Sequence, residues 1–259
     1  ACHSGDKFLA QATLASIRHF CPDVPVCLVV DGAADVSELK KLYGFIELRV
    51  ADLPNDEMRA MMLGTPRSKL AAMWEGPFEH FVWMDSDAIA WGNFVPFVNR
   101  DLEFQIFWSE ISIPQGEKVP PSWLRHYYFD PEKLAKFDPE FEWRGLPYFS
   151  DGVFACRRNA IPFERWKGAF EWNQAPESPW PRDFFCMPIM NYLVHSMAQR
   201  GELKVDFTDL QHIWLHHGKD EIVRDCAGGG WRLPEAVPRP RVLHFCGRKP
   251  YILTRKNFT

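Results

Sequence analysis

Phe81-Val82-Trp83-Met84-Asp85-Ser86-Asp87-Ala88 is the stretch of sequence that decides the fold. It completes an apolar run, Phe78 to Met84, which reads as a buried strand ending at Asp85. The two carboxylates stand two residues apart where the chain leaves this strand, so both can approach one divalent cation. Hard cations such as Mg²⁺ and Mn²⁺ prefer oxygen ligands of this kind. The pattern predicts a metal site that a diphosphate can complete.

Helical signals and short apolar runs alternate on either side of this motif. Helices are expected over Phe8 to Phe20, Ser37 to Tyr43 with Ser37 as its cap, Arg67 to Trp74, and Phe184 to Gln199. Further strands are expected over Val24 to Val30, Phe45 to Val50, Tyr148 to Arg157, and Val242 to Phe245. This alternation predicts an α/β fold with a mostly parallel sheet and helices on both faces. Ligands of such sheets bind beyond the carboxyl ends of the strands, where Asp85 would lie.

The length of 259 residues suits a single domain over residues 1–259. Residues 110–147 are rich in Pro, Trp, Tyr and charges and show weak periodicity. We expect them to form an insert on the acceptor side, with at most short helices. Asp225 to Trp231 contains three consecutive glycines and is expected to be a mobile loop.

The composition narrows the class of protein. Hydrophobic residues make up 46% of the chain, which predicts a sizeable packed core. The net charge is -4 and no basic run alternates with aromatics, so no nucleic-acid partner is expected. No stretch approaches the roughly 20 apolar residues of a transmembrane span, although association with a membrane surface stays open.

Cysteine usage points to a reducing compartment. The seven cysteines form no C-x-x-C pair, which argues against a zinc knuckle and fits free thiols. No signal peptide is visible, so a cytoplasmic protein is expected. The chain starts with Ala rather than Met, which leaves room for upstream residues.

A second group of polar residues follows the last predicted strand, in Val242-Leu243-His244-Phe245-Cys246-Gly247-Arg248-Lys249-Pro250. His244 can ligate a metal through its neutral imidazole. Gly247 permits close approach of the backbone to a phosphate, and Lys249 can neutralise phosphate oxygens. The alternative is a basic turn with only a structural histidine.

Taken together, the strand with D-x-D and the later H-x-x-G-x-K-P segment resemble the retaining glycosyltransferases typified by glycogenin and the lipooligosaccharide galactosyltransferases. That family has the GT-A fold. Three further segments match: Ala1-Cys2-His3-Ser4-Gly5-Asp6 resembles its first nucleotide-binding loop, Arg67-Ser68-Lys69-Leu70 its R-x-K-L helix start, and Arg182-Asp183 the start of its D-Q-D region. The family's first strand would then lie mostly before residue 1.

Tyr148-Phe149-Ser150-Asp151-Gly152-Val153 resembles a fourth family segment, Y-F-N-A-G-V. Ser150-Asp151 stands where the family has Asn-Ala, and Phe184 stands where it has Gln.

The resemblance implies roles for these residues. Asp85, Asp87 and His244 would hold Mn²⁺ or Mg²⁺ on the diphosphate of a UDP-sugar. The donor would also be bound by Ala1, Cys2, His3, Asp6, Arg67, Lys69, Ser86, Gly247 and Lys249. A hexose would pass, with retention, to a glycan, lipid-linked or protein acceptor. Asp151 and Asp183 are candidate catalytic residues that position the sugar or stabilise its cation. Their alternatives are a turn residue before Gly152 and a helix cap.

Two other functions stay open. A phosphohydrolase can use a D-x-D pair, with the first Asp as nucleophile, but it carries the motif after its first strand. Here the motif follows at least two predicted strands. A non-catalytic sugar- or nucleotide-binding module would also explain the 11 Trp and 21 Phe. The combined metal and diphosphate residues argue against such a module.

Overall fold

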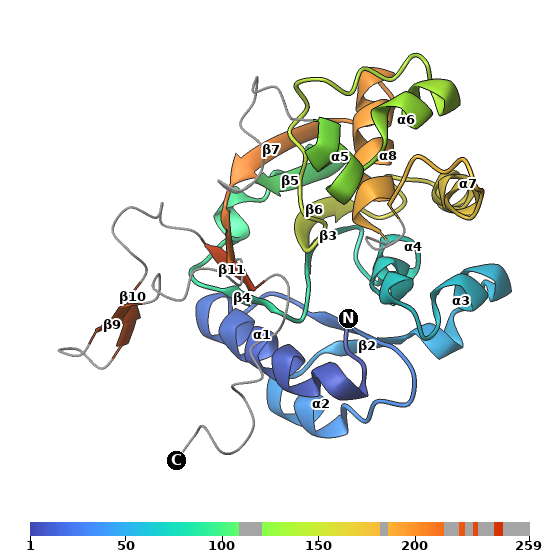
Figure 1. Ribbon diagram of the computed structural model, residues 1–259. Helices are drawn as coiled ribbons and strands as arrows, with labels where there is room; N and C mark the ends of the chain where they lie inside the picture. The colour runs from blue at the N-terminus through green and yellow to red at the C-terminus, as the bar shows by residue number, and fades with distance from the viewer. Residues whose placement is uncertain (109–120, 182–185, 215–222, 226–229, 233–240, 246–259) are drawn as a thin grey trace.

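Helices and strands alternate along the chain in the computed structural model, which describes residues 1–108, 121–181, 186–214, 223–225, 230–232 and 241–245 (Figure 1). The helices are α1 (Lys7–Phe20), α2 (Ser37–Tyr43), α3 (Asp56–Met62), α4 (Ala72–Glu75), α5 (Pro121–Tyr127), α6 (Pro131–Phe137), α7 (Phe163–Asn173) and α8 (Met187–Gln199). The strands are β1 (Cys27–Val30), β2 (Ile46–Arg49), β3 (His80–Met84), β4 (Ala88–Ala90), β5 (Phe104–Trp108), β6 (Val153–Arg157), β7 (Val205–Asp209), β8 (Gln211–Trp214), β9 (Val223–Asp225), β10 (Gly230–Arg232) and β11 (Val242–Phe245). The predicted α/β class is confirmed.

The strands form mixed sheets rather than the mostly parallel sheet that the sequence suggested. In the four-stranded sheet β3-β6-β5-β7, the pairs β3–β6 and β6–β5 are antiparallel and β5–β7 is parallel. In β4-β11-β8, β11 runs antiparallel to β4 and parallel to β8. A parallel pair, β1–β2, forms a separate sheet. Strands β3, β5 and β7 run in one direction, and β6, which lies between β3 and β5, runs against both, so the sheet departs from the pattern of repeated βαβ units.

Strand β6 lies between two hydrophobic clusters and presents apolar side chains to both of them. Phe154 and Cys156 belong to a cluster that includes side chains of α7 and α8. Val153 and Ala155 point to the other side, where they join residues of β4, β11 and α1. Because side chains alternate along a strand, this continuous apolar run fits a sheet that is buried on both faces.

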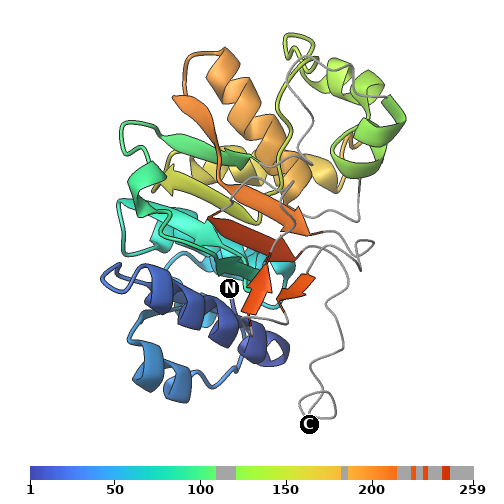
Figure 2. The same ribbon diagram turned by 90° about the vertical axis from the view of Figure 1, so that its left-hand side faces the viewer.

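Strand β1 shows the same two-sided burial, with helices on each side. Leu28 and Val30 pack with residues of α1 and α2, whereas Val29 belongs to the larger cluster on the opposite face. Figure 2 shows α1 and α2 in blue on one side of the strands and α8 in orange on the other. The expectation of helices on both faces is therefore confirmed.

Three expected elements differ in detail. Ser37 is the first residue of α2 rather than its cap, because its N–H donates to the Asp35 carboxylate at 3.0 Å. The helix expected over Arg67 to Trp74 is a 3₁₀-helix, Pro66–Ala71, followed by α4. Asp225 ends β9 and Gly230 begins the antiparallel strand β10, so the ends of the expected loop belong to a hairpin. Residues 226–229 lie outside the described part of the chain.

Candidate active site

The D-x-D motif forms a tight turn between β3 and β4. The N–H of Asp85 donates to the carbonyl of Gly152 at 2.8 Å, and the N–H of Ala88 donates back to the carbonyl of Asp85 at 3.0 Å. From α1, the hydroxyl of Thr13 lies 2.9 Å from the carbonyl of Ser86 and 2.8 Å from that of Ala88. Backbone contacts from β6 and a side chain of α1 thus fix the turn that carries both carboxylates.

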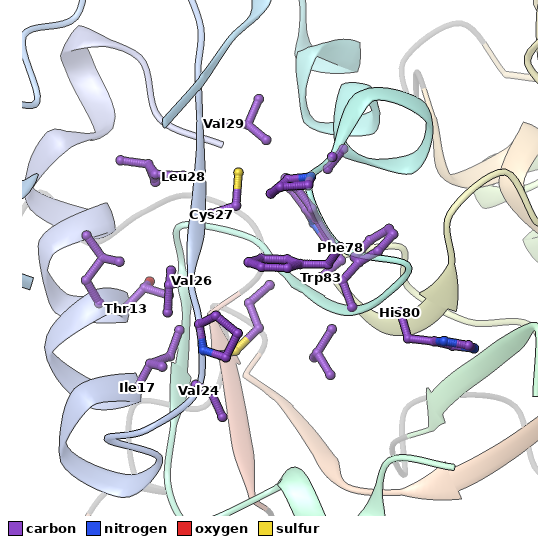
Figure 3. A pocket seen from close by; sticks show the side chains of 18 of the residues that line it. Thr13, Ile17, Val24, Val26, Cys27, Leu28, Val29, Phe78, His80 and Trp83 are labelled. Atoms are coloured by element: carbon purple, nitrogen blue, oxygen red, sulfur yellow. The ribbon is translucent and has the colours of Figure 1, made fainter. Parts of the chain in front are cut away.

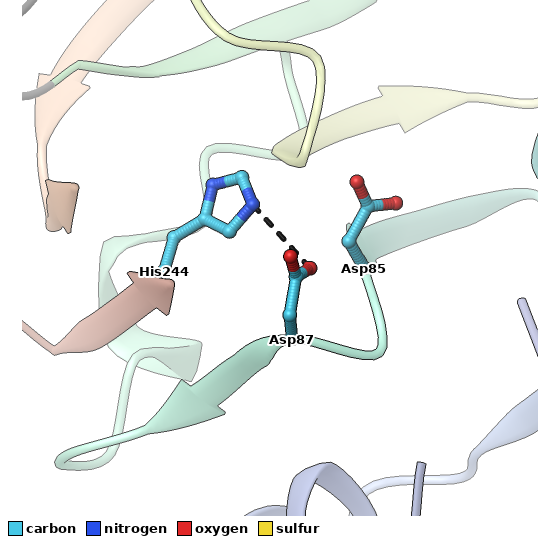
Figure 4. Close-up of side chains that lie close together, drawn as sticks. All are labelled: Asp85, Asp87 and His244. Atoms are coloured by element: carbon cyan, nitrogen blue, oxygen red, sulfur yellow. Dashed lines mark ion pairs between the residues drawn. The ribbon is translucent and has the colours of Figure 1, made fainter. Parts of the chain in front are cut away.

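His244 reaches this turn from the far end of the chain. In the antiparallel pair β11–β4 it lies opposite Ala88, and the N–H of Phe245 donates to the carbonyl of Asp87 at 2.9 Å. One ligand atom from each of Asp85, Asp87 and His244 lies within 4.8 Å of the other two. Figure 4 shows the imidazole facing the Asp87 carboxylate, with Nε2 at 3.5 Å from Oδ1. The structure therefore brings together the three residues that the sequence proposes as metal ligands.

Lys69 connects two carboxylates at the edge of this group. Its Nζ lies 3.2 Å from Asp85 Oδ2 and 3.1 Å from Asp151 Oδ2. Burial lowers the pKa of Lys69, but Asp151 and Asp85 together raise it by more, so the pKa ends above its ordinary value. Lys69 is therefore a fixed positive charge that holds Asp85 and Asp151 in place.

The balance of charge and the chemistry of the ligands fit a divalent cation. In the described part of the chain, Lys69 is shared by the carboxylates of Asp85 and Asp151, and the carboxylate of Asp87 lies close to that of Asp85. Asp87 and His244 are buried, so little water is available to screen the negative charge of the carboxylates. Two carboxylate oxygens and an imidazole nitrogen are ligands that suit Mn²⁺, and Mg²⁺ accepts the carboxylates readily.

The residues of the predicted nucleotide-binding loop make contacts among themselves and with β1. Cys2 pairs with Val30 as a parallel bridge, through hydrogen bonds to Val29 and Asp31. His3 Nε2 lies 2.7 Å from Asp6 Oδ2. This segment therefore continues the edge of the β1–β2 sheet.

Arg67 lies apart from these contacts. Its Nε donates to the carbonyl of Met61 at 3.0 Å, and its guanidinium lies over the ring of Phe170 on α7, 4.4 Å from the ring centre. Burial lowers its pKa. Three further predicted site residues, Asp183, Gly247 and Lys249, lie outside the described residues.

A cavity of about 240 Å³ lies between β1 and β3, behind the turn (Figure 3). Ala1 and Ser86 line it, but most of its lining is apolar, as at Val26 and Leu28. Trp83 separates the cavity from the carboxylates, since its ring lines the cavity while Nε1 donates to Asp85 Oδ1 at 2.9 Å. None of the three proposed metal ligands is among the described residues that line it, and its mostly apolar lining offers few groups that suit a diphosphate.

Sequence reasoning missed the roles of three residues around the proposed ligands. Trp83 orients Asp85. Gly152 leaves room for His244, because a Cβ atom at Gly152 would lie 2.0 Å from its Cε1. Gln211 contacts His244, with Oε1 at 3.1 Å from Nδ1. The Asp151-Gly152 dipeptide signals only a turn, and no signal in the sequence singles out Gln211.

No protein-family model matches the sequence, and no curated protein matches it significantly. Solved structures do match its fold. The galactosyltransferase LgtC, solved with donor and acceptor sugar analogues, is 14% identical, with a TM-score of 0.54 over 95% of this chain and 85% of that one. The bifunctional glycosyltransferase WbbM is 12% identical, with a TM-score of 0.54 over 95% of this chain and 45% of that one.

Mouse xyloside xylosyltransferase 1 is 13% identical, with a TM-score of 0.50 over 93% of this chain and 92% of that one. The chain therefore has the GT-A fold, as the sequence resemblance implies. Among the helices that the structure describes, none combines the length and the apolar character needed to cross a bilayer.

Proposed function

We propose that this protein is a metal-dependent glycosyltransferase that transfers a hexose from a nucleoside-diphosphate sugar to a hydroxyl acceptor. The observation that carries the proposal is the convergence of Asp85, Asp87 and His244, from the β3–β4 turn and from β11, within 4.8 Å. Their chemistry fits a divalent cation, and the GT-A fold supports a nucleotide-sugar donor.

In this proposal the three ligands hold Mn²⁺ or Mg²⁺ against the diphosphate. When bound, the cation would neutralise the charge that builds on the leaving diphosphate. Gly247 and Lys249 follow His244 by three and five residues, close enough along the chain to approach the same diphosphate. Lys249 would add positive charge there, and the backbone at Gly247 would donate hydrogen bonds.

The reacting sugar would lie beside Asp151. This carboxylate is buried and held by Lys69, which already neutralises part of its charge. Asp151 and Asp183 are the proposed residues that position the sugar or stabilise positive charge at its anomeric carbon. Retention of configuration follows from the resemblance to the retaining family.

The proposal also covers the base of the donor nucleotide, the residues that support the donor, and the acceptor. We propose uridine as the base, bound by the loop of Ala1, Cys2, His3 and Asp6 together with Ser86. Arg67 and Lys69 support the donor from the 3₁₀-helix that contains them. The acceptor would be a glycan, a lipid-linked sugar or a protein, reached beside residues 110–147.

The direct test is a screen of nucleotide sugars with Mn²⁺, reading out cleavage of the donor with and without acceptors. We expect the wild type to cleave one UDP-sugar. In Asp87→Asn the rate of cleavage should fall by at least about 100-fold, because a metal ligand is lost. Asp101→Asn removes an exposed carboxylate on another turn and serves as the matched control. It should act like the wild type.

Other outcomes would replace the proposal. Phosphate release from a phosphomonoester, without sugar transfer, would indicate a phosphohydrolase. A tightly bound nucleotide that is never turned over would indicate a binding module. Normal donor cleavage by Asp87→Asn would remove the metal site from the chemistry.

A further inference from the structure

Gln211 is a buried amide whose orientation is determined by its neighbours. It is 1% exposed and lies at the start of β8, beside β11. Its Nε2 lies 2.8 Å from the carbonyl oxygen of Phe107. Because a carbonyl can only accept a hydrogen bond, the amide nitrogen of Gln211 must face Phe107. The amide oxygen then faces His244.

This orientation fixes the protonation of the imidazole. Gln211 Oε1 lies 3.1 Å from His244 Nδ1 and can only accept, so in neutral His244 the proton resides on Nδ1. Nε2 is then left with its lone pair, and it faces Asp87 Oδ1 at 3.5 Å. Two electron-rich atoms facing each other in a buried site are stabilised by a cation that both can bind.

The register of the sheet explains why Gln211 reaches His244. In the parallel pair β8–β11, Gln211 lies opposite Val242, and His244 lies opposite Ile213. Gln211 and His244 are therefore diagonal neighbours on the same face of the sheet, because side chains alternate along each strand. From another side, Gly152 confines the ring, as the 2.0 Å distance from its Cβ position to His244 Cε1 shows.

We infer that Gln211 is a positioning residue of the metal site, which holds His244 as the tautomer whose Nε2 can bind the cation. The inference rests on the proposed function, since it requires that the site binds a divalent metal. Partners of this type, which accept the second ring N–H of a metal-binding histidine, typically change metal affinity by 10- to 100-fold when they are removed.

The test measures Mn²⁺ binding to the whole chain by calorimetry, without donor or acceptor. Gln211→Leu should weaken binding by about tenfold or more, because Nδ1 loses its acceptor and the ring can change its tautomer or orientation. Gln211→Glu keeps an oxygen that accepts from Nδ1–H, so it should bind Mn²⁺ more tightly than Gln211→Leu does; its second oxygen replaces the donor to the Phe107 carbonyl, which should lower stability.

Gln105→Leu is the matched control. Gln105 is also a buried glutamine of the core, 2% exposed, and its amide bonds the carbonyl of Phe97 and the hydroxyl of Thr208 rather than His244. This variant should lose stability, as Gln211→Leu does, but keep the wild-type affinity for Mn²⁺. If both variants lose affinity for Mn²⁺, the loss comes from disturbed core packing in general, and the positioning role of Gln211 is overturned.

The outcomes separate the inference from the proposed function. If wild-type protein binds no Mn²⁺, the metal site itself fails. If wild type and Gln211→Leu bind Mn²⁺ equally, the metal site stands and the positioning role is overturned. Should Gln211→Leu not fold, ¹⁵N NMR of the wild-type imidazole decides, because a proton on Nε2 of neutral His244 would overturn the inference.

Discussion

At Gly152 the need for glycine is a matter of space rather than of backbone conformation. The residue that precedes β6 lies against the face of His244, and the nearest ring atoms to an added Cβ would be Cε1 at 2.0 Å and Nε2 at 2.6 Å. Since real Cβ atoms do not approach so closely, any side chain here must push the imidazole away. The carbonyl of Gly152 also accepts the N–H of Asp85, so the same residue touches two of the three proposed ligands.

The first prediction concerns Gly152→Ala. We expect affinity for Mn²⁺, measured by calorimetry, to fall by at least about tenfold, because the displaced imidazole no longer points Nε2 at Asp87. Gly168→Ala is the control, since Gly168 lies in α7 with open space around its Cβ position. That variant should keep its affinity and gain stability by about 0.5–1 kcal/mol from the better helix former. Unchanged affinity in Gly152→Ala would show that His244 is not a ligand.

For single residues, the sequence predicts the proposed site residues that belong to a recognisable local motif. Asp85 and Asp87 follow an apolar strand, and His244 ends another, so each is visible without knowing its neighbours. Trp83 and Gln211 could not be assigned, because their roles depend on which strands pair and in which register. Arg67 has a clear local motif and its guanidinium packs on Phe170, and its role toward the donor stays a prediction.

Among the elements, α8 joins the core to the segment that precedes Asp151. Asn191 exchanges hydrogen bonds with the backbone of Phe149, at 2.9 and 2.8 Å. One turn later, His195 Nε2 lies 3.2 Å from the carbonyl of Pro147, and its ring packs edge-on against Tyr148 and Phe149. The helix therefore holds the chain that delivers Asp151 and Gly152 to the site.

The second prediction follows from the burial of His195. Burial lowers the pKa of His195 to about 4, although the hydrogen bond to Pro147 acts in the opposite direction. The unfolded chain takes up this proton near pH 6.5 and the folded chain only near pH 4, so stability falls as the pH drops between these values. The loss at pH 5 amounts to roughly 2 kcal/mol.

Urea unfolding at pH 7.5 and pH 5 measures this effect. His195→Gln keeps a side-chain donor but cannot be protonated, so it should be less stable than the wild type at pH 7.5 and lose less stability on acidification. Equal losses in both proteins would show that another group causes the acid sensitivity.

The elements themselves were predictable where a periodic apolar pattern exists. Helices α1, α2 and α8 and strands β3 and β11 lie within the expected ranges, apart from differences of a few residues at their ends. The strand directions were not predictable. A strand buried on both faces is apolar whether its neighbours run parallel or antiparallel, so the apolar run of β6 could not reveal that both its neighbours are antiparallel.

For the whole molecule, the proposed metal site joins parts of the chain that are distant in sequence. The D-x-D turn follows β3, His244 lies in β11, and α1 fixes the turn through Thr13. Strand β11 pairs with β4 and β8, so it reaches the site only when these strands have assembled. A cation held by all three ligands therefore binds the folded chain in preference to the unfolded one.

The third prediction is that Mn²⁺ raises the thermal stability of this protein through Asp87. A ligand at 100 times its dissociation constant stabilises the folded state by about 2.7 kcal/mol. For a chain of this size that corresponds to an increase of roughly 5 °C in Tm, measurable by scanning calorimetry without any substrate. Asp87→Asn should lose most of the increase, whereas Asp101→Asn should keep it because its carboxylate lies on an exposed turn. An equal increase in all three proteins would show that Asp87 does not bind the cation.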